Sequence, residues 1–258
     1  MKKTPHIDYR KNNTPSTIAP VACIGFCHYN PRELATMTLR SLSGNGFYPV
    51  NPRPINVEEF ADSICYVHYE DLGNELLGKT VFCYDGMPHI YISTALAEPE
   101  TLEELGMLRF VFAHEVCHVI IHNPLYKKAC DLCNHTRPRY NASEIGQIRT
   151  ACFERKDVDG LCFSSQFEYQ ASRAGAYLLM PPELLHRVVF ACLGNDLYPY
   201  ACGKLTDLSS RMLEIVDCVQ STFAVGRKLA EFGVRRMFRA HHAARAKNLS
   251  FYEMVQMF

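Results

Sequence analysis

The most regular hydrophobic pattern in the chain predicts a long helix between residues 101 and 122. Apolar side chains recur there at intervals of three and four, which places them on one helix face: Leu102, Leu105, Leu108, Phe112, Val116 and Val119. Thr101–Glu104 has the form of a capping box, in which threonine begins the helix and glutamate bonds back to it. We expect the helix to end near Asn123, because Pro124 disfavours helical geometry in the residue before it.

The segment before this helix predicts short helices followed by strands. The helices are expected at Pro31–Leu42 and Val57–Ser63, and the strands at Ile64–Tyr69, Lys79–Tyr84 and Ile90–Ser93. These strands would form a small sheet in front of the long helix. An edge strand of such a sheet can hold an extended peptide by backbone hydrogen bonds, although the sequence does not say which strand is the edge.

The second half of the chain is predicted to be helical. A helix capped by Ser165 and halted by Pro181 carries Glu168 on the same face as the small residues Ala171, Ser172 and Gly175, which lets it approach another helix closely. Three more helices are expected: Leu184–Leu193, Leu208–Val216 and Val219–Phe232, the last ending at Gly233.

Composition indicates an ordinary soluble protein. The 258 residues contain 27 basic and 27 acidic side chains, so no overall field points to nucleic acid or to an acidic membrane. The chain has neither an apolar run of about eighteen residues nor an apolar signal core after Met1, and we expect a cytoplasmic protein with no membrane partner. Its 12 cysteines are then expected to be reduced thiols.

The central helix contains the motif His-Glu-x-x-His, formed by His114, Glu115 and His118. Residues four apart lie on one helix face, so both imidazoles can reach one zinc ion, with a third protein ligand from elsewhere and water in the fourth position. Glu115 could then act as a general base for peptide-bond hydrolysis. The plainer interpretation is that both histidines are satisfied core residues.

His122 lies one turn further along the same helix. Three ligands rising along a straight helix would span about 12 Å, at about 1.5 Å per residue, which is too far for one ion. We therefore interpret His122 as a histidine that supports a metal ligand or has a structural role, rather than as a ligand itself.

Glu168 has two interpretations. A carboxylate on a closely packing helix face could be the third metal ligand, or it could be the last residue of a capping box that begins at Ser165. From the residues alone, the capping role is slightly favoured.

The polar segment 126–165 holds four cysteines that could form a second, structural zinc site: Cys130, Cys133, Cys152 and Cys162. The first two have a CxxC spacing, but nine residues separate the other two, and free reduced thiols are the favoured interpretation.

Several of these motifs together resemble the ImmA/IrrE family of metallopeptidases, over about residues 45–235. The resemblance rests on the strand-like runs, on the segment from Arg109 to His118 with His122-Asn123-Pro124, and on Glu168-x-x-Ala171-Ser172 ending in Leu178-Leu179-Met180-Pro181. It departs from the family in the longer cysteine-bearing insertion and in Ala174-Gly175, where an aromatic-Ala pair is more usual.

The resemblance implies an α+β fold with a zincin-like metallopeptidase core, a small mixed sheet, an HExxH helix and a helical C-terminal region. Composition and pattern predict an N-terminal arm and helix over 1–45. The resemblance implies a core over 46–182 with a cysteine-bearing insertion at 126–165, and a helix-turn-helix-like region over 183–258. By similarity, His114, His118 and Glu168 hold one catalytic zinc, although manganese would also accept this ligand set. Glu115 acts as the base, while Tyr177 and His122 are candidates for stabilising the oxyanion.

The resemblance also implies a cytoplasmic metalloendopeptidase that cleaves a helix-turn-helix repressor and so releases genes of a mobile element or a stress response. The alternative is a non-catalytic regulator with a structural metal that binds the repressor or DNA, and a degenerate family member that only binds the repressor is a third interpretation. Basic residues near the C-terminus make direct DNA contact a further, less favoured expectation: Arg227, Lys228, Arg235, Arg236, Arg239, Arg245 and Lys247.

Overall fold

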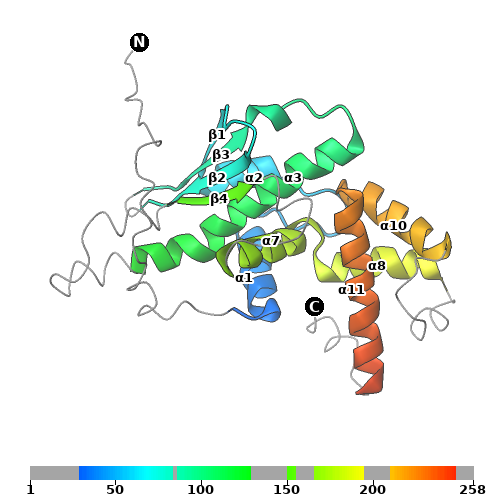
Figure 1. Cartoon of the computed structure of the whole chain (residues 1–258). Helices are drawn as coiled ribbons and strands as arrows, with labels where there is room; N and C mark the ends of the chain where they lie inside the picture. Colours follow the sequence, from blue (N-terminus) through cyan, green and yellow to red (C-terminus); the bar gives the residue numbers. More distant parts are fainter. Residues whose placement is uncertain (1–28, 84–85, 129–149, 155–165, 195–209, 248–258) are drawn as a thin grey trace, which may run out of the picture.

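The computed structural model describes residues 29–83, 86–128, 150–154, 166–194 and 210–247, in which helices gather on one side of a small sheet (Figure 1). The sheet has four strands in the order β1-β3-β2-β4: β1 (Tyr66–Glu70), β2 (Leu76–Val81), β3 (His89–Ser93) and β4 (Thr150–Glu154). β1 is parallel to β3, while β2 is antiparallel to both β3 and β4. The predicted α+β class with a small mixed sheet is therefore confirmed.

The first three strands were predicted from the sequence, but β4 was not. It lies within the polar, cysteine-bearing segment, whose composition gives little strand signal. β4 pairs with β2, so that Thr80 lies opposite Ala151 in the register. This segment therefore becomes a strand because it pairs with β2, some seventy positions earlier in the sequence. The local pattern of hydrophobic residues does not reveal such a distant partner.

Two helices precede the sheet, close to their predicted positions: α1 (Pro31–Gly44) and α2 (Val57–Ile64). Asn30 caps α1 in a capping box with Glu33, and the Asn56 side chain accepts a hydrogen bond at the start of α2. Both helices bury apolar residues in the core. The predicted N-terminal arm lies in residues 1–28, which are outside the described part of the chain.

Helix α3 (Leu102–Cys117) is the centre of the molecule and begins at the predicted capping box of Thr101 and Glu104. Leu102, which the hydrophobic pattern assigns to the core, is 42% exposed, whereas every residue from Val111 to Val119 is buried. A helix buried on all sides lies inside the core rather than on its surface. Figure 1 shows α3 passing between the sheet and α7.

The predicted end of this helix near Asn123 is wrong. Residues His118–His122 form a single π-turn, in which the Asn123 N–H bonds to the His118 carbonyl, and the helix then continues through Pro124 to Lys128. In a regular α-helix the proline ring collides with the carbonyl four residues before it. The π-turn widens the helix directly ahead of Pro124, and this makes room for the ring.

Helix α7 (Gln166–Leu179) packs against α3 and α1. The two helices approach closely at Gly175, where an added Cβ would lie 3.2 Å from the backbone carbonyl carbon of Ala113 and from the nitrogen of His114. The face of small side chains predicted for this helix is thus the face that contacts α3. The Ser165 cap lies outside the described residues.

The C-terminal helices are α8 (Pro182–Leu193), α10 (Ser210–Phe223) and α11 (Arg227–Ala246). The break between the last two was predicted before Val219 and is found at 224–226, where Ala224 has a φ of 49°. The predicted end at Gly233 is also wrong, because α11 continues past it. An added Cβ at Gly233 would lie 3.0 Å from the Met180 methyl carbon, so this glycine serves close packing rather than helix termination.

The break between α10 and α11 is fixed to the first turns of α3. Glu103 accepts hydrogen bonds from the backbone N–H of Arg227 and from the Gln220 amide. Arg109 donates to the carbonyl of Phe223, the last residue of α10, which lies directly before the break. Between these contacts, an added Cβ on Gly106 would lie 2.2 Å from the Gly226 nitrogen. The two backbones are therefore in direct contact.

The continuous helix Leu102–Lys128 is long and apolar enough to cross a membrane, as is the bent pair Phe167–Leu179 and Pro182–Leu193. In the single helix, 72% of the apolar window is buried within the protein, which is typical of a core helix.

Gly106→Ala tests the contact between α3 and the C-terminal helices. The new methyl group would meet backbone atoms of Val225 and Gly226, which cannot rotate away, so we expect a loss of about 2 kcal/mol in the free energy of unfolding. Urea denaturation measures the loss. Gly44→Ala is the matched control, because nothing lies within 4 Å of that site. Equal midpoints for the two variants would contradict the contact.

Candidate metal centre

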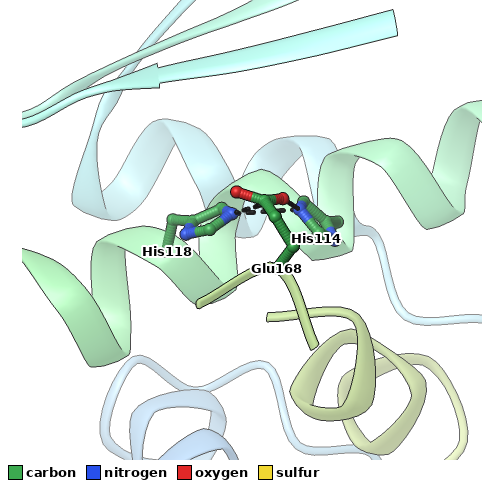
Figure 2. A group of neighbouring side chains, drawn as sticks. All are labelled: His114, His118 and Glu168. Atoms are coloured by element: carbon green, nitrogen blue, oxygen red, sulfur yellow. Dashed lines mark hydrogen bonds and ion pairs between the residues drawn. The ribbon is translucent and has the colours of Figure 1, made fainter. Parts of the chain in front are cut away.

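Three buried side chains from two helices converge on one point: His114 and His118 from the central helix and Glu168 from α7 (Figure 2). Glu168 Oε2 lies 2.9 Å from His114 Nε2 and 3.4 Å from His118 Nε2, and the two Nε2 atoms are 3.0 Å apart. The carboxylate of Glu168 thus lies at both imidazoles, as a third ligand would.

The spacing of these three atoms fits a metal ion. Ligands in a tetrahedral zinc site, with bonds of about 2.0–2.1 Å, are separated by about 3.3 Å. The observed separations of 2.9, 3.0 and 3.4 Å lie around this value. Two imidazole nitrogens and one carboxylate oxygen are also a usual protein ligand set for zinc when one position stays open.

Hydrogen bonds alone do not satisfy this triangle. An imidazole nitrogen either carries a proton and donates or is bare and accepts. If both Nε2 atoms donate to Glu168, they face each other as two donors at 3.0 Å; if one of them is bare, a contact with the carboxylate is lost. A cation at the centre takes a lone pair from all three atoms. The group could therefore hold a metal ion.

Ser172 orients the first histidine. Its hydroxyl lies 3.0 Å from His114 Nδ1, and it stands one helical turn after Glu168 on α7. Burial, followed by the proximity of His118, lowers the pKa of His114 to about 4, although the hydrogen bond with Glu168 opposes the shift. The imidazole is neutral at neutral pH, which is the form that binds metals.

Glu168 remains ionised in the same surroundings. Burial raises the pKa of its carboxyl group, but hydrogen bonds with His114 and His118 outweigh that effect and hold the pKa well below its usual range. A charged carboxylate between neutral imidazoles is the combination that attracts a divalent cation.

His122 lies behind His118, on the side away from Glu168. Its Nδ1 is 2.8 Å from His118 Nδ1, and its Nε2 is 3.0 Å from Gln170 Oε1. Burial lowers the pKa of His122 well below its usual value. We predicted that His122 is not a ligand because three ligands on a straight α-helix lie too far apart. The helix has a π-turn here, so that assumption does not hold, but both His122 nitrogens contact other side chains, those of His118 and Gln170.

Glu115 is fully buried between the metal ligands and strand β2. The Thr80 hydroxyl donates to its Oε2 at 2.5 Å, while Oε1 has no hydrogen-bond partner in the described part of the chain. Burial and, to a smaller extent, the charge on Glu168 raise the pKa of Glu115 well above its usual value, although the Thr80 hydrogen bond opposes the shift. One carboxylate oxygen is thus anchored and the other is available.

Gly78 provides the space for this carboxylate. An added Cβ would lie 2.6 Å from Glu115 Oε1 and 2.8 Å from a methyl carbon of Val111. Gly78 and Thr80 are two residues apart in β2, so both face Glu115. Neither was predicted as a site residue, because a glycine and a threonine in a strand give no sequence signal of a base on a distant helix.

Tyr177 does not lie with the metal ligands. Its hydroxyl accepts hydrogen bonds from Arg236 and, at 3.4 Å, from Arg173. Tyr177 follows Glu168 by two and a half helical turns, and it therefore projects from the opposite side of α7. This position gives no support to the predicted role in stabilising an oxyanion.

The predicted second zinc site falls mainly outside the described residues. Cys130, Cys133 and Cys162 lie there entirely, and Cys152 lies in β4, where only its backbone pairing with Lys79 is described.

Comparison with protein-family models and with curated proteins gives no match for this chain. The interpretation of the site therefore depends on the geometry of its own residues and on the motifs in its sequence.

Glu168→Gln tests the metal centre. The amide keeps the shape of the side chain but removes its charge, so we expect zinc affinity to fall by more than about 100-fold, beyond the loss usual for residues that only support a ligand. Competition with a chromogenic chelator measures the affinity. Glu214→Gln, at an exposed position of α10, is the control and should leave affinity unchanged. Equal affinity in both variants would exclude Glu168 as a ligand.

Proposed function

We propose that this protein is a cytoplasmic zinc-dependent endopeptidase with a zincin-like core, of the ImmA/IrrE type that its motifs resemble. The observation that carries the proposal is the convergence of His114, His118 and Glu168 beside the buried carboxylate of Glu115. In the described part of the chain the group contains three protein donors, and a structural zinc site needs four. This count supports an open, catalytic arrangement over the non-catalytic regulator.

Zinc bound by these three side chains would polarise the carbonyl of the scissile peptide bond and lower the pKa of a water molecule in its open position. A side chain of the protein then transfers the proton of this water molecule. Glu115 Oε1 accepts it as the water oxygen attacks the carbonyl carbon, while the Thr80 hydroxyl holds Oε2 in place. When the C–N bond breaks, Glu115 returns the proton to the leaving nitrogen.

The sheet has an edge on which an extended peptide substrate can lie. Its two edges are β1 and β4. β1 packs against α2, whereas β4 packs against both α3 and α7, which carry the ligands. β4 also pairs with β2, the strand that holds Glu115. We infer that an extended substrate adds to the edge of β4 that pairs with no strand in the described part of the chain, and so brings its scissile carbonyl towards the metal.

The substrate we propose is a helix-turn-helix repressor, whose cleavage would release genes of a mobile element or a stress response. This part of the proposal comes from the motif resemblance alone. The C-terminal helices α10 and α11 are available as a docking surface for the repressor, because α11 exposes Lys228 and Arg239.

Glu115→Gln tests the proposed base. The zinc-loaded protein should cleave the helix-turn-helix repressor encoded nearest to its gene, and the variant should lose at least about 10²-fold in rate, the usual contribution of a general base. Gel analysis of the products measures cleavage, and chelator competition should show zinc still bound to both proteins. Failure of both to cleave, with tight binding of the repressor or DNA, would favour the regulator.

Gly78→Ala tests whether the position of the carboxylate matters. The three atoms nearest to the added methyl group belong to Glu115 and Val111, and none belongs to a proposed metal ligand. We therefore expect the cleavage rate to fall by about 10²-fold while zinc affinity stays unchanged. Gly44→Ala serves again as the control. Full activity in Gly78→Ala would show that the carboxylate tolerates displacement and would contradict its role as a positioned base.

A further inference from the structure

We infer that Gln170 and His122 are positioning residues that fix the proton of His118 on Nδ1 and so keep its Nε2 free to bind the metal. This inference rests on the proposed metal centre and extends it to a hydrogen-bonded chain: Gln170 Oε1, the His122 ring, the His118 ring and the ion. Its two contacts measure 3.0 Å and 2.8 Å.

The positions of the protons follow from the contacts. The two Nδ1 atoms, 2.8 Å apart, can share one proton only if one donates and the other accepts. A metal ligand must present a bare nitrogen, so His118 carries its proton on Nδ1 and donates it to His122. His122 then carries its own proton on Nε2, and Gln170 Oε1 accepts it at 3.0 Å.

The hydrogen-bonded chain from Gln170 to His118 is shielded from solvent and held in place by tertiary packing. His122 is 1% exposed and Gln170 is 3% exposed. The Phe167 ring packs against the His122 ring with centroids 4.4 Å apart. The π-turn of His118–His122 sets the direction of both histidines, and π-turns are frequent at functional sites. Water therefore does not replace either contact readily.

The two metal histidines are held by different chemistry. Ser172, which contacts His114, has a hydroxyl that can either donate or accept, and it tolerates both tautomers of the ring. Gln170 selects between tautomers through the orientation of its amide. With Oε1 towards His122, the chain leaves His118 Nε2 bare; with the amide reversed, every proton shifts and His118 Nε2 becomes protonated. The orientation found is the one that permits metal binding.

Zinc affinity of the full-length protein, measured by chelator competition, tests the inference. Gln170→Leu keeps the volume but removes the acceptor, and His122→Phe keeps a ring but removes both nitrogens. We expect each to weaken zinc binding by about 10- to 100-fold, the usual effect of losing a group that orients a ligand. Gln170→Glu retains an obligatory acceptor and should bind zinc at least as tightly as the wild type. Ile121→Val, an equally buried neighbour, controls for loss of packing.

A second measurement reports the protons directly. Long-range ¹H–¹⁵N correlation spectra of the zinc-loaded wild type should show His118 protonated on Nδ1 and His122 protonated on Nε2. The opposite tautomer of His122 would overturn the inference, as would wild-type affinity in both Gln170→Leu and His122→Phe. Thermal unfolding of the metal-free proteins identifies a variant that fails to fold, in which case the spectra decide.

The same experiment separates this inference from the proposed function. If Glu168→Gln binds zinc as the wild type does, the metal centre itself is wrong. If Glu168→Gln loses zinc but the Gln170 and His122 variants keep it, only the positioning chain fails.

Discussion

The candidate metal centre depends on how closely α7 approaches α3. At Gly175 the two backbones leave no room for a side chain without a shift of the neighbouring atoms, and Ala171 and Ala174 are fully buried along the same helix. Glu168 has only two methylene groups, and its carboxylate reaches two imidazoles because the helices are so close. Glu168, Gln170 and Ser172 lie on one rigid element, so any change in helix spacing would move all three together.

Electrostatics make the same site costly without a cation. Glu115 and Glu168 bring two carboxyl groups into a buried region, where each ionised group loses most of its hydration. Lys79 favours the charged form of Glu115, but burial and the charge on Glu168 act more strongly against it. A divalent ion between the ligands would stabilise both carboxylates. The raised pKa of Glu115 and the spacing of the three donor atoms both agree with a site that could hold a cation.

The sequence predicted the parts of this structure that local patterns encode. The capping box at Thr101 and the spacing of His114 and His118 are local, and the face of small side chains on α7 follows from helix periodicity.

The π-turn was missed because Pro124 signals a helix end unless the preceding turn is widened, and nothing in the neighbouring residues indicates that widening. Gly78 and Thr80 were missed because their relation to Glu115 exists only once β2 crosses α3. The role of Gln170 likewise depends on a contact 48 positions away.

The attachment of the C-terminal helices to α3 has a consequence for how the protein unfolds. A single apolar cluster runs from Leu34 in α1 to Ala240 in α11, and Glu103, Gly106 and Arg109 join the α10–α11 break to the helix that carries the metal ligands. Removing residues beyond 182 would strip apolar cover from that helix and leave its first turns without their partners. We therefore expect the C-terminal helices and α3 to unfold together, because these contacts join them. We also expect truncation of the C-terminal region to destabilise the helix that carries His114 and His118.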